Sequence, residues 1–88
     1  MIVRIDKRFE KDIKAFKNQK INSVVIKLID SIKKAENISQ IKNIKKLLGY
    51  KFYYRIREGD YRIGLEVNNE EIILIRFLHR KDIYNKWP

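Results

Sequence analysis

The first half of the chain carries apolar residues at the spacing of α-helices. They are Phe9, Ile13 and Phe16 in a first stretch, and Ile21, Val24, Val25, Leu28, Ile29 and Ile32 in a second. Asp6 precedes the first stretch and suits the N-cap of a helix. The pattern predicts a strand over residues 1–5 and helices over residues 7–17 and 20–36, which form a hairpin with one apolar side.

From Lys51 onward, apolar and polar side chains alternate with a period of two, which is typical of strands with one buried face. Two such stretches, residues 51–57 and 60–67, flank Glu58-Gly59. A tight turn at these two residues makes the stretches neighbouring antiparallel strands.

The remaining segments complete a predicted sheet. Residues 71–79 are apolar on both faces, as expected of a central strand, and Asn68-Asn69 predicts the turn that leads into them. Residues 38–48 favour a short helical turn or a packed loop that ends at Gly49. The order β-α-α-β-β-β, with a short C-terminal segment, predicts an α+β fold. A small antiparallel sheet of about four strands packs on the N-terminal helical hairpin, in one domain over residues 1–88.

Strict alternation assigns side chains to the two faces of this sheet. The face on the helices is predicted to carry Tyr61, Ile63, Leu65, Leu74 and Leu78. The opposite, open face is predicted to carry Tyr53, Arg55, Arg62, Phe77 and His79. One face is therefore expected to be both basic and aromatic.

The expected turn at Glu58-Gly59 places Arg55 directly opposite Arg62, and Lys51 opposite Glu66. Like charges in such a pair destabilise a sheet. A phosphate held by both guanidinium groups would remove the repulsion. Two alternatives stay open: the side chains extend into solvent, or nearby carboxylates neutralise them. A longer, bulged turn would shift the two arginines but leave them on one face.

The composition adds a strong excess of positive charge. Lysine and arginine total 21 residues against 11 aspartates and glutamates, which gives a net charge of +10. This excess suggests a polyanionic partner such as nucleic acid, an acidic protein or an anionic membrane surface, although a merely lysine-rich surface would look the same. The chain has no cysteine, which suits a cytoplasmic protein, and no apolar stretch long enough for a membrane span. Its carboxylates are scattered, so no metal site is expected. No cofactor and no membrane partner are expected either.

The segment after the central strand supplies candidate groups for proton transfer. His79, Arg80 and Tyr84 lie near the end of that strand and are expected to converge with Arg62 at one edge of the sheet. Histidine suits proton transfer near neutral pH, although a lone histidine is more often structural. Arginines beside a proton-transfer group suit the cleavage of RNA, because RNA carries its own nucleophile, the 2′-hydroxyl.

The stretches "YYRIREGDYRIGLEV" and "IILIRFLHRKDIYNKWP" resemble the RelE/ParE superfamily of type II toxin–antitoxin toxins, and within it the RelE-like mRNA interferases. The motifs R-x-G-x-Y-R-I and HRK-x-x-Y carry the resemblance over about residues 50–88, whereas the first half matches in its order of elements. The resemblance implies metal-independent cleavage of mRNA in the ribosomal A site, by attack of the 2′-hydroxyl on the adjacent phosphate. It also implies a cognate antitoxin protein that inhibits the toxin.

The resemblance also implies roles for single residues. Arg62 matches an arginine that grips the scissile phosphate. Arg80 matches a basic residue that stabilises charge in the transition state. Tyr84 matches an aromatic residue that stacks on a base and assists proton transfer.

Further matches concern the approach of the RNA. Arg55 matches a basic residue of the preceding strand, and His79 lies where several relatives have histidine. Tyr53 stands where the best-studied type has a lysine, so the proton-transfer role is expected to fall to His79 or Tyr84. Contacts to RNA are expected from Arg55, Tyr53, Lys45, Lys46 and Lys51.

Two other functions stay open. ParE-like members of the superfamily inhibit DNA gyrase and cleave no RNA; they share the fold but usually lack the full catalytic set. The presence of Arg55, Arg62, His79, Arg80 and Tyr84 favours the interferase. A basic RNA-binding or ribosome-associated protein without enzymatic activity is the third alternative.

Overall fold

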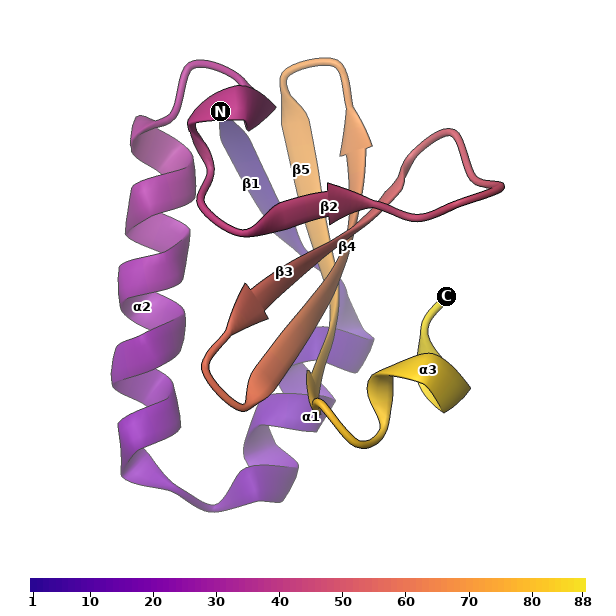
Figure 1. Ribbon diagram of the computed structural model, residues 1–88. Helices are drawn as coiled ribbons and strands as arrows, with labels where there is room; N and C mark the ends of the chain where they lie inside the picture. The colour runs from indigo at the N-terminus through magenta and orange to yellow at the C-terminus, as the bar shows by residue number, and fades with distance from the viewer.

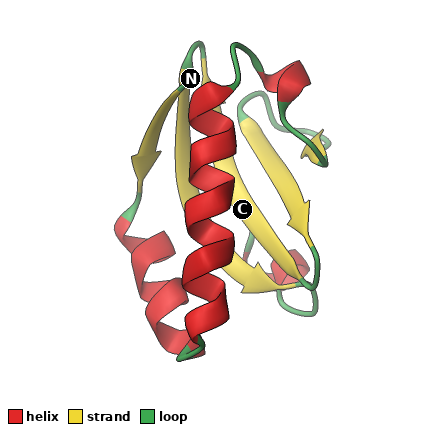
Figure 2. Ribbon diagram, turned by 90° about the vertical axis from the view of Figure 1, so that its left-hand side faces the viewer, coloured by secondary structure: helices red, strands yellow, loops and turns green.

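Five strands and three helices make up the computed structural model, which describes residues 1–88 (Figure 1). The helices are α1 (Lys7–Phe16), α2 (Gln19–Lys34) and α3 (Ile83–Lys86), with a 3-10 turn η1 (Ile38–Gln40). The strands are β1 (Ile2–Ile5), β2 (Ile44–Lys46), β3 (Tyr53–Glu58), β4 (Tyr61–Asn68) and β5 (Glu71–His79). They form one sheet in the order β1-β5-β4-β3-β2, and the α1–α2 hairpin covers one of its faces (Figure 2). The predicted α+β fold is confirmed.

The sheet differs from the expectation in two details. It has five strands, because residues 44–46, expected in a helical turn or loop, pair with β3 as a short edge strand. It is mixed, because β1 runs parallel to β5 and the other pairs are antiparallel. The helical hairpin between β1 and the other strands supplies the long crossover that a parallel pair needs. None of the helices combines the length and apolar character needed to cross a membrane.

Side-chain caps set the boundaries of the two long helices. The Asp6 carboxylate accepts a hydrogen bond from the backbone N–H of Arg8 at 2.8 Å, which starts α1. Asn18 does the same for α2 through the N–H of Lys20 at 2.9 Å. Lys17 ends α1 in the left-handed conformation, with φ of 49°. These caps separate the two apolar stretches into the two helices of a hairpin.

The main core lies between the helical hairpin and the sheet. It contains 14 buried residues, including Phe9 and Ile32 from the helices and Ile56 and Leu65 from the strands. Phe9 and Phe77 pack edge to face, with ring centroids 5.9 Å apart. The apolar helical stripes therefore pack on the sheet as expected.

A β-bulge in β5 reverses the faces of the side chains that follow it. Gly64 pairs with Arg76 and Leu65 with Leu74, so Ile75 is an extra residue in β5. After the bulge, Phe77 points into the main core and Leu78 packs on the opposite face. The predicted faces of these two residues are therefore wrong, because strict alternation does not allow for an extra residue.

The face opposite the long helices carries a second, smaller core. Ile75, Leu78, Ile83 and Trp87 are buried there together, and Tyr53 packs against them. Helix α3 and the residues after it thus cover part of the face that was expected to be open (Figure 1). The uncovered part is the region around the β3–β4 hairpin.

One ion pair ties α1 to the bulge. Arg76 donates from Nε and Nη2 to the two carboxylate oxygens of Asp12, at 2.7 and 3.0 Å. Asp12 also accepts from the backbone N–H of Phe77 at 3.0 Å. Both side chains are largely buried, and this one carboxylate satisfies a buried guanidinium and a backbone N–H beside the bulge.

Asp12→Ala should destabilise the fold by about 3 kcal/mol, because it leaves the buried Arg76 guanidinium without its partner. Asp30→Ala is the matched control, since Asp30 forms an exposed pair with Lys34 on α2; it should cost about 0.5 kcal/mol or less. Urea unfolding of the two variants measures the difference. Equal midpoints would contradict a structural role for the Asp12–Arg76 pair.

Candidate active site

A two-residue loop, Gly59-Asp60, joins β3 to β4 and sets the register of the two strands. Gly59 has φ of +59°, in the left-handed region that favours glycine. Glycine at the first of two loop residues is typical of a type II′ hairpin turn. The expected loop at Glu58-Gly59 is therefore wrong, because it would have placed a glutamate in a loop position that favours glycine or asparagine.

The observed register pairs Arg57 with Arg62 and Arg55 with Gly64. The predicted pairing of Arg55 with Arg62 is wrong, and Glu66 faces Tyr53 instead of Lys51. Each cross-strand partner is displaced by two residues from the predicted one, so the side chains of β3 and β4 stay on their predicted faces. The sheet therefore holds Arg55, Arg57 and Arg62 on one face, and Arg57 rather than Arg55 lies directly opposite Arg62.

A polar pocket of about 380 Å³ lies on this face at the β2–β3 edge of the sheet. It is lined by Asn43, Ile44, Lys45, Arg55, Arg57, Arg62 and Tyr84. Lys45 lies opposite Arg55 across the β2–β3 pair, and no carboxylate lines the pocket. None of its four cations forms an ion pair. The pocket therefore suits an anion.

Arg62 is held in place by the backbone of its own turn. Its Nη1 donates to the carbonyl oxygens of Gly59 at 2.7 Å and Tyr61 at 2.8 Å. Burial, and then the charges of Arg55, Arg57 and Arg80, lower the pKa of Arg62. The surrounding charges thus oppose the positive charge of Arg62, and a bound anion would relieve that repulsion.

Tyr84 reaches this pocket from α3. Its side chain is 80% exposed, and its hydroxyl accepts a hydrogen bond from Nη1 of Arg55 at 3.3 Å. The Arg55 guanidinium carbon lies 5.6 Å from the ring centroid. The hydrogen bond from Arg55, and then its charge, lower the pKa of the Tyr84 hydroxyl below that of free tyrosine. The structure therefore brings Arg55, Arg62 and Tyr84 together, as expected.

His79 does not share a face with Arg62. It pairs with Tyr61 across β4 and β5, and their rings lie edge to face with centroids 6.2 Å apart. Arg62 pairs instead with Leu78, on the other side of the sheet. Nδ1 of His79 accepts the N–H of Lys81 at 3.2 Å. The prediction that His79 and Arg62 converge on one face is wrong, because the bulge at Ile75 changed the alternation.

The other predicted residues lie outside the lining of the pocket. Arg80 lies beside the β3–β4 loop, where Nε is 3.9 Å from the Asp60 carboxylate. Tyr53 packs between Tyr50 and Trp87, with ring centroids 5.5 and 5.0 Å away. Lys46 and Lys51 line a separate hollow on the β2–β3 connection, together with residues 47–50. Sequence reasoning missed Arg57, although glycine at position 59 was a signal for the turn that brings it opposite Arg62.

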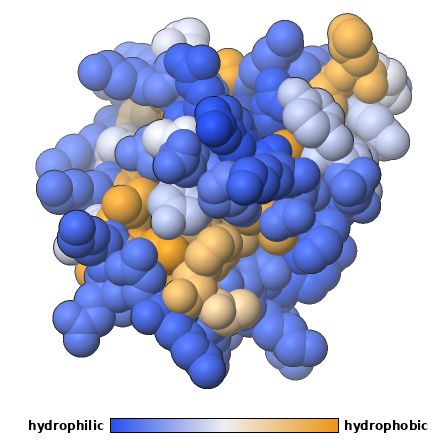
Figure 3. All heavy atoms as spheres, turned by 60° about the horizontal axis from the view of Figure 1, so that its bottom comes forward, coloured by the Kyte–Doolittle hydropathy of each residue, from blue (hydrophilic) through white to orange (hydrophobic).

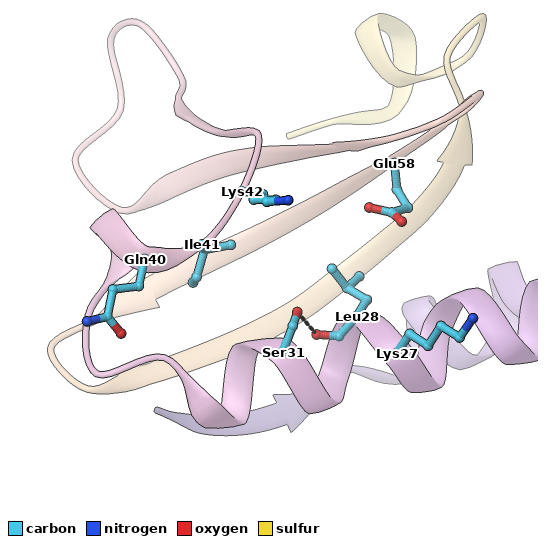
Figure 4. A pocket seen from close by; sticks show the side chains of 7 residues that line it. All are labelled: Lys27, Leu28, Ser31, Gln40, Ile41, Lys42 and Glu58. Carbon is cyan, nitrogen blue, oxygen red and sulfur yellow. Dashed lines mark hydrogen bonds between the residues drawn. The ribbon is translucent and has the colours of Figure 1, made fainter.

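A second groove lies on the helix side of the sheet, between α2 and the segment that leads to β2 (Figure 4). It has a volume of about 370 Å³ and is lined by Lys27, Leu28, Ser31, Gln40, Ile41, Lys42 and Glu58. Ser31 donates its hydroxyl to the carbonyl of Leu28 at 2.8 Å (Figure 4). No group in this groove activates that hydroxyl, so the arginine pocket is the better candidate for chemistry.

Comparison with known proteins identifies the family. A family model described as the ParE toxin of the type II toxin–antitoxin system parDE matches residues 3–84. Toxin RelE3 of Methanocaldococcus jannaschii is 43% identical over 89 aligned positions, which cover 100% of both chains. The chain belongs to the RelE/ParE superfamily of type II toxins.

Solved structures agree with this assignment. A chain of the RelB–RelE antitoxin–toxin complex from Methanococcus jannaschii is 40% identical, with a TM-score of 0.79 over 97% of this chain and 99% of that one. A chain of the archaeal RelE–RelB complex from Pyrococcus horikoshii is 25% identical, with a TM-score of 0.71 over 90% and 93%. The family model carries the ParE description, whereas these relatives carry RelE names. Because the RelE-named relative is 43% identical over its full length, the chain is a RelE-type toxin.

In this toxin, α3 is anchored by a tryptophan that lies on a glycine. A Cβ atom at Gly64 would clash with the indole of Trp87, closer than any real contact allows. The indole N–H donates to the carbonyl of Tyr54 at 3.1 Å. Sequence reasoning missed both residues; the one signal was a glycine inside a strand, which often marks a close approach. Tyr84 is placed beside Arg55 by the helix that this contact anchors.

Gly64→Ala should displace Trp87 and loosen α3, at a cost of about 1–3 kcal/mol for overpacking. Trp87 is the single tryptophan of the toxin, so its fluorescence reports the displacement directly. In a Trp87→Ala background, Gly64→Ala should cost much less, because the clashing ring is absent. Equal penalties in both backgrounds would show that Gly64 is needed for some other reason.

Proposed function

We propose that this toxin is a ribosome-dependent, metal-independent endoribonuclease that cleaves mRNA in the ribosomal A site and so inhibits translation. The observation that carries the proposal is the pocket that brings Arg55, Arg57 and Arg62 beside Tyr84. These residues supply cations for a phosphate and one group that can exchange a proton. Kinship with RelE-named toxins supports the same activity.

The chemistry requires little from the protein. The 2′-oxygen of the RNA attacks the adjacent phosphorus and loses its proton, while the bond to the 5′-oxygen breaks and that oxygen gains a proton. Negative charge increases on the phosphate oxygens as the new bond forms. Nη1 of Arg62 is engaged by two carbonyls, which leaves its Nε and Nη2 protons free for the phosphate. Arg55 and Arg57 add positive charge beside it.

Tyr84 is the better proton-transfer group of the two that the sequence left open. Its hydroxyl lies in the pocket, and the hydrogen bond from Arg55 lowers its pKa below that of free tyrosine. His79 lies on the other face of the sheet, beside Tyr61. Arg80, whose charge helps to lower the pKa of Arg62, would stabilise charge on the leaving group. Exposure of the Tyr84 ring also leaves its face available to stack on a base.

The partners follow from the same charges. The ribosome and its mRNA are the polyanions that a net charge of +10 favours. The related RelE structures are complexes with RelB antitoxins, and we expect a cognate antitoxin here. An acidic or amphipathic segment of that antitoxin would bind as a helix or an added strand and neutralise the arginine pocket.

Inhibition of DNA gyrase is the second candidate, because the matching family model is described as a ParE toxin. In vitro translation with primer extension on the mRNA separates the two functions. Cuts at one position of the A-site codon that require ribosomes would support the nuclease. Intact mRNA together with gyrase-dependent DNA breaks would select the second candidate.

Arg62→Ala should lower single-turnover cleavage on programmed ribosomes by about 10²–10³-fold, because a donor to the developing phosphate charge is lost. Arg62→Lys should restore only part of the rate, since lysine keeps the charge but not the planar fork. Thermal melting should stay near that of the parent, or rise slightly as repulsion from Arg57 disappears. Arg4→Ala, in the distant strand β1, is the control and should cleave normally. A large fall in the melting temperature of Arg62→Ala would make the arginine structural.

Tyr84→Phe should lower the rate by about 10²–10⁴-fold if the hydroxyl moves a proton. His79→Ala should have a much smaller effect, because its ring lies outside the pocket. Both rates are measured at saturating ribosome concentration, so that weaker binding does not enter. The opposite order of effects would assign proton transfer to His79 and would require α3 or the end of β5 to move on the ribosome.

A further inference from the structure

A stretch without acidic residues leads away from the arginine pocket. Residues 37–57 contain no aspartate or glutamate. They contain Lys42, Lys45, Lys46, Lys51, Arg55 and Arg57. No member of this set forms an ion pair. Positive charge therefore continues from the pocket along the β2–β3 connection, which projects from the edge of the sheet (Figure 1).

Exposed aromatic and apolar side chains lie among these cations. Tyr50 and Phe52 are 46% and 50% exposed, and Leu48 at the tip is 95% exposed. Figure 3 shows such an apolar group at its upper right, among largely hydrophilic atoms and on the side where Figure 1 places this connection. Large apolar side chains on a small protein are costly to leave in water, so this loop is a candidate contact surface.

The ring of Tyr50 is held in position next to the pocket. It lies 5.5 Å from the ring of Tyr53, which is itself 5.0 Å from the indole of Trp87. Tyr53 and Arg55 share a face of β3 and are two residues apart, about 7 Å along the strand. An RNA strand with one phosphate at Arg55 would therefore bring a neighbouring base to this ring pair within one or two nucleotides.

We infer that Tyr50 is a stacking platform for a base of single-stranded RNA that flanks the nucleotide in the arginine pocket, with Lys45 and Lys51 on its phosphates. This inference rests on the proposed function, because the strand is the same RNA. Unpaired cations beside an exposed aromatic face are the features of single-strand binding. An acidic protein segment would also suit the positive charges, but it would not require Tyr53 and Trp87 to hold the ring of Tyr50 in place.

The experiment is an abasic scan of a short RNA with a 2′-deoxy nucleotide at the scissile position, so that it binds without being cleaved. Affinity is measured by fluorescence anisotropy at low salt, for the parent and for Tyr50→Ala. At one position, removal of the base should weaken binding to the parent by about 5- to 150-fold. At that position alone, removal should cost Tyr50→Ala almost nothing, because the stacking partner is already gone.

Two variants serve as controls. Tyr50→Phe keeps the aromatic face and should behave as the parent. Leu48→Ala removes a more exposed side chain of the same loop and should leave the abasic profile unchanged. Tyr84→Ala should remove a response at a different position of the RNA, if its ring also stacks.

The outcomes separate this inference from the proposed function. No binding of any oligonucleotide, or equal abasic profiles for the parent and Tyr50→Ala, would overturn the inference while ribosomal cleavage by the parent still stood. Suppose that removal of one base weakens binding to the parent but not to Tyr50→Ala, while the parent does not cleave mRNA on ribosomes. That result would overturn the proposed function and leave the stacking site. Weaker binding of the antitoxin by Tyr50→Ala, with an unchanged RNA profile, would overturn the inference in favour of a protein partner.

Discussion

The contact of Trp87 with Gly64 links the fold to the site. The indole covers the place where every other residue type would have a Cβ atom, and its N–H satisfies the carbonyl of Tyr54. This contact closes the small core beneath α3, and α3 in turn places Tyr84 over Arg55. Because the helix has only four residues, it is too short to be stable by itself. Its position depends on the side chains that anchor it at either end, Ile83 and Trp87.

The second constraint is the concentration of positive charge on strands β2, β3 and β4. Arg57 and Arg62 lie directly opposite each other, and so do Lys45 and Arg55. Such pairs cost stability, and the lowered pKa of Arg62 reflects part of that cost. The main core of 14 buried residues on the other side of the sheet can offset it. The main core thus stabilises the fold enough to hold these cations close together, and it lies on the face of the sheet opposite the arginine pocket.

How far the sequence predicts this molecule depends on the range of each interaction. Periodicity and caps are local, so the helices, the three long strands and the common face of the arginines follow from the sequence. The bulge at Ile75 depends on how β5 meets β4, and the alternation therefore misplaced Phe77, Leu78 and His79. The place of Trp87 on Gly64 joins residues 23 positions apart, and no short motif encodes such a contact. The parallel direction of β1 is likewise set by the crossover rather than by its own four residues.

The separation of the two cores has a physical consequence for control of the toxin. The main core holds the α1–α2 hairpin on the sheet, whereas only four buried residues hold the C-terminal segment. A ligand shifts a conformational equilibrium only by the difference between its affinities for the two states. Opening the small core would displace only Ile83 and Trp87, because Ile75 and Leu78 belong to β5, and this costs far less than disruption of the core of 14. A partner of modest differential affinity would therefore suffice to move Tyr84 away from Arg55 while the sheet stays folded. The arginines, which lie on β3 and β4, would remain in place and could bind the acidic groups of that partner. Under the proposed function, the same cations would serve RNA when α3 is docked and an inhibitor when it is not, because neither role requires them to move.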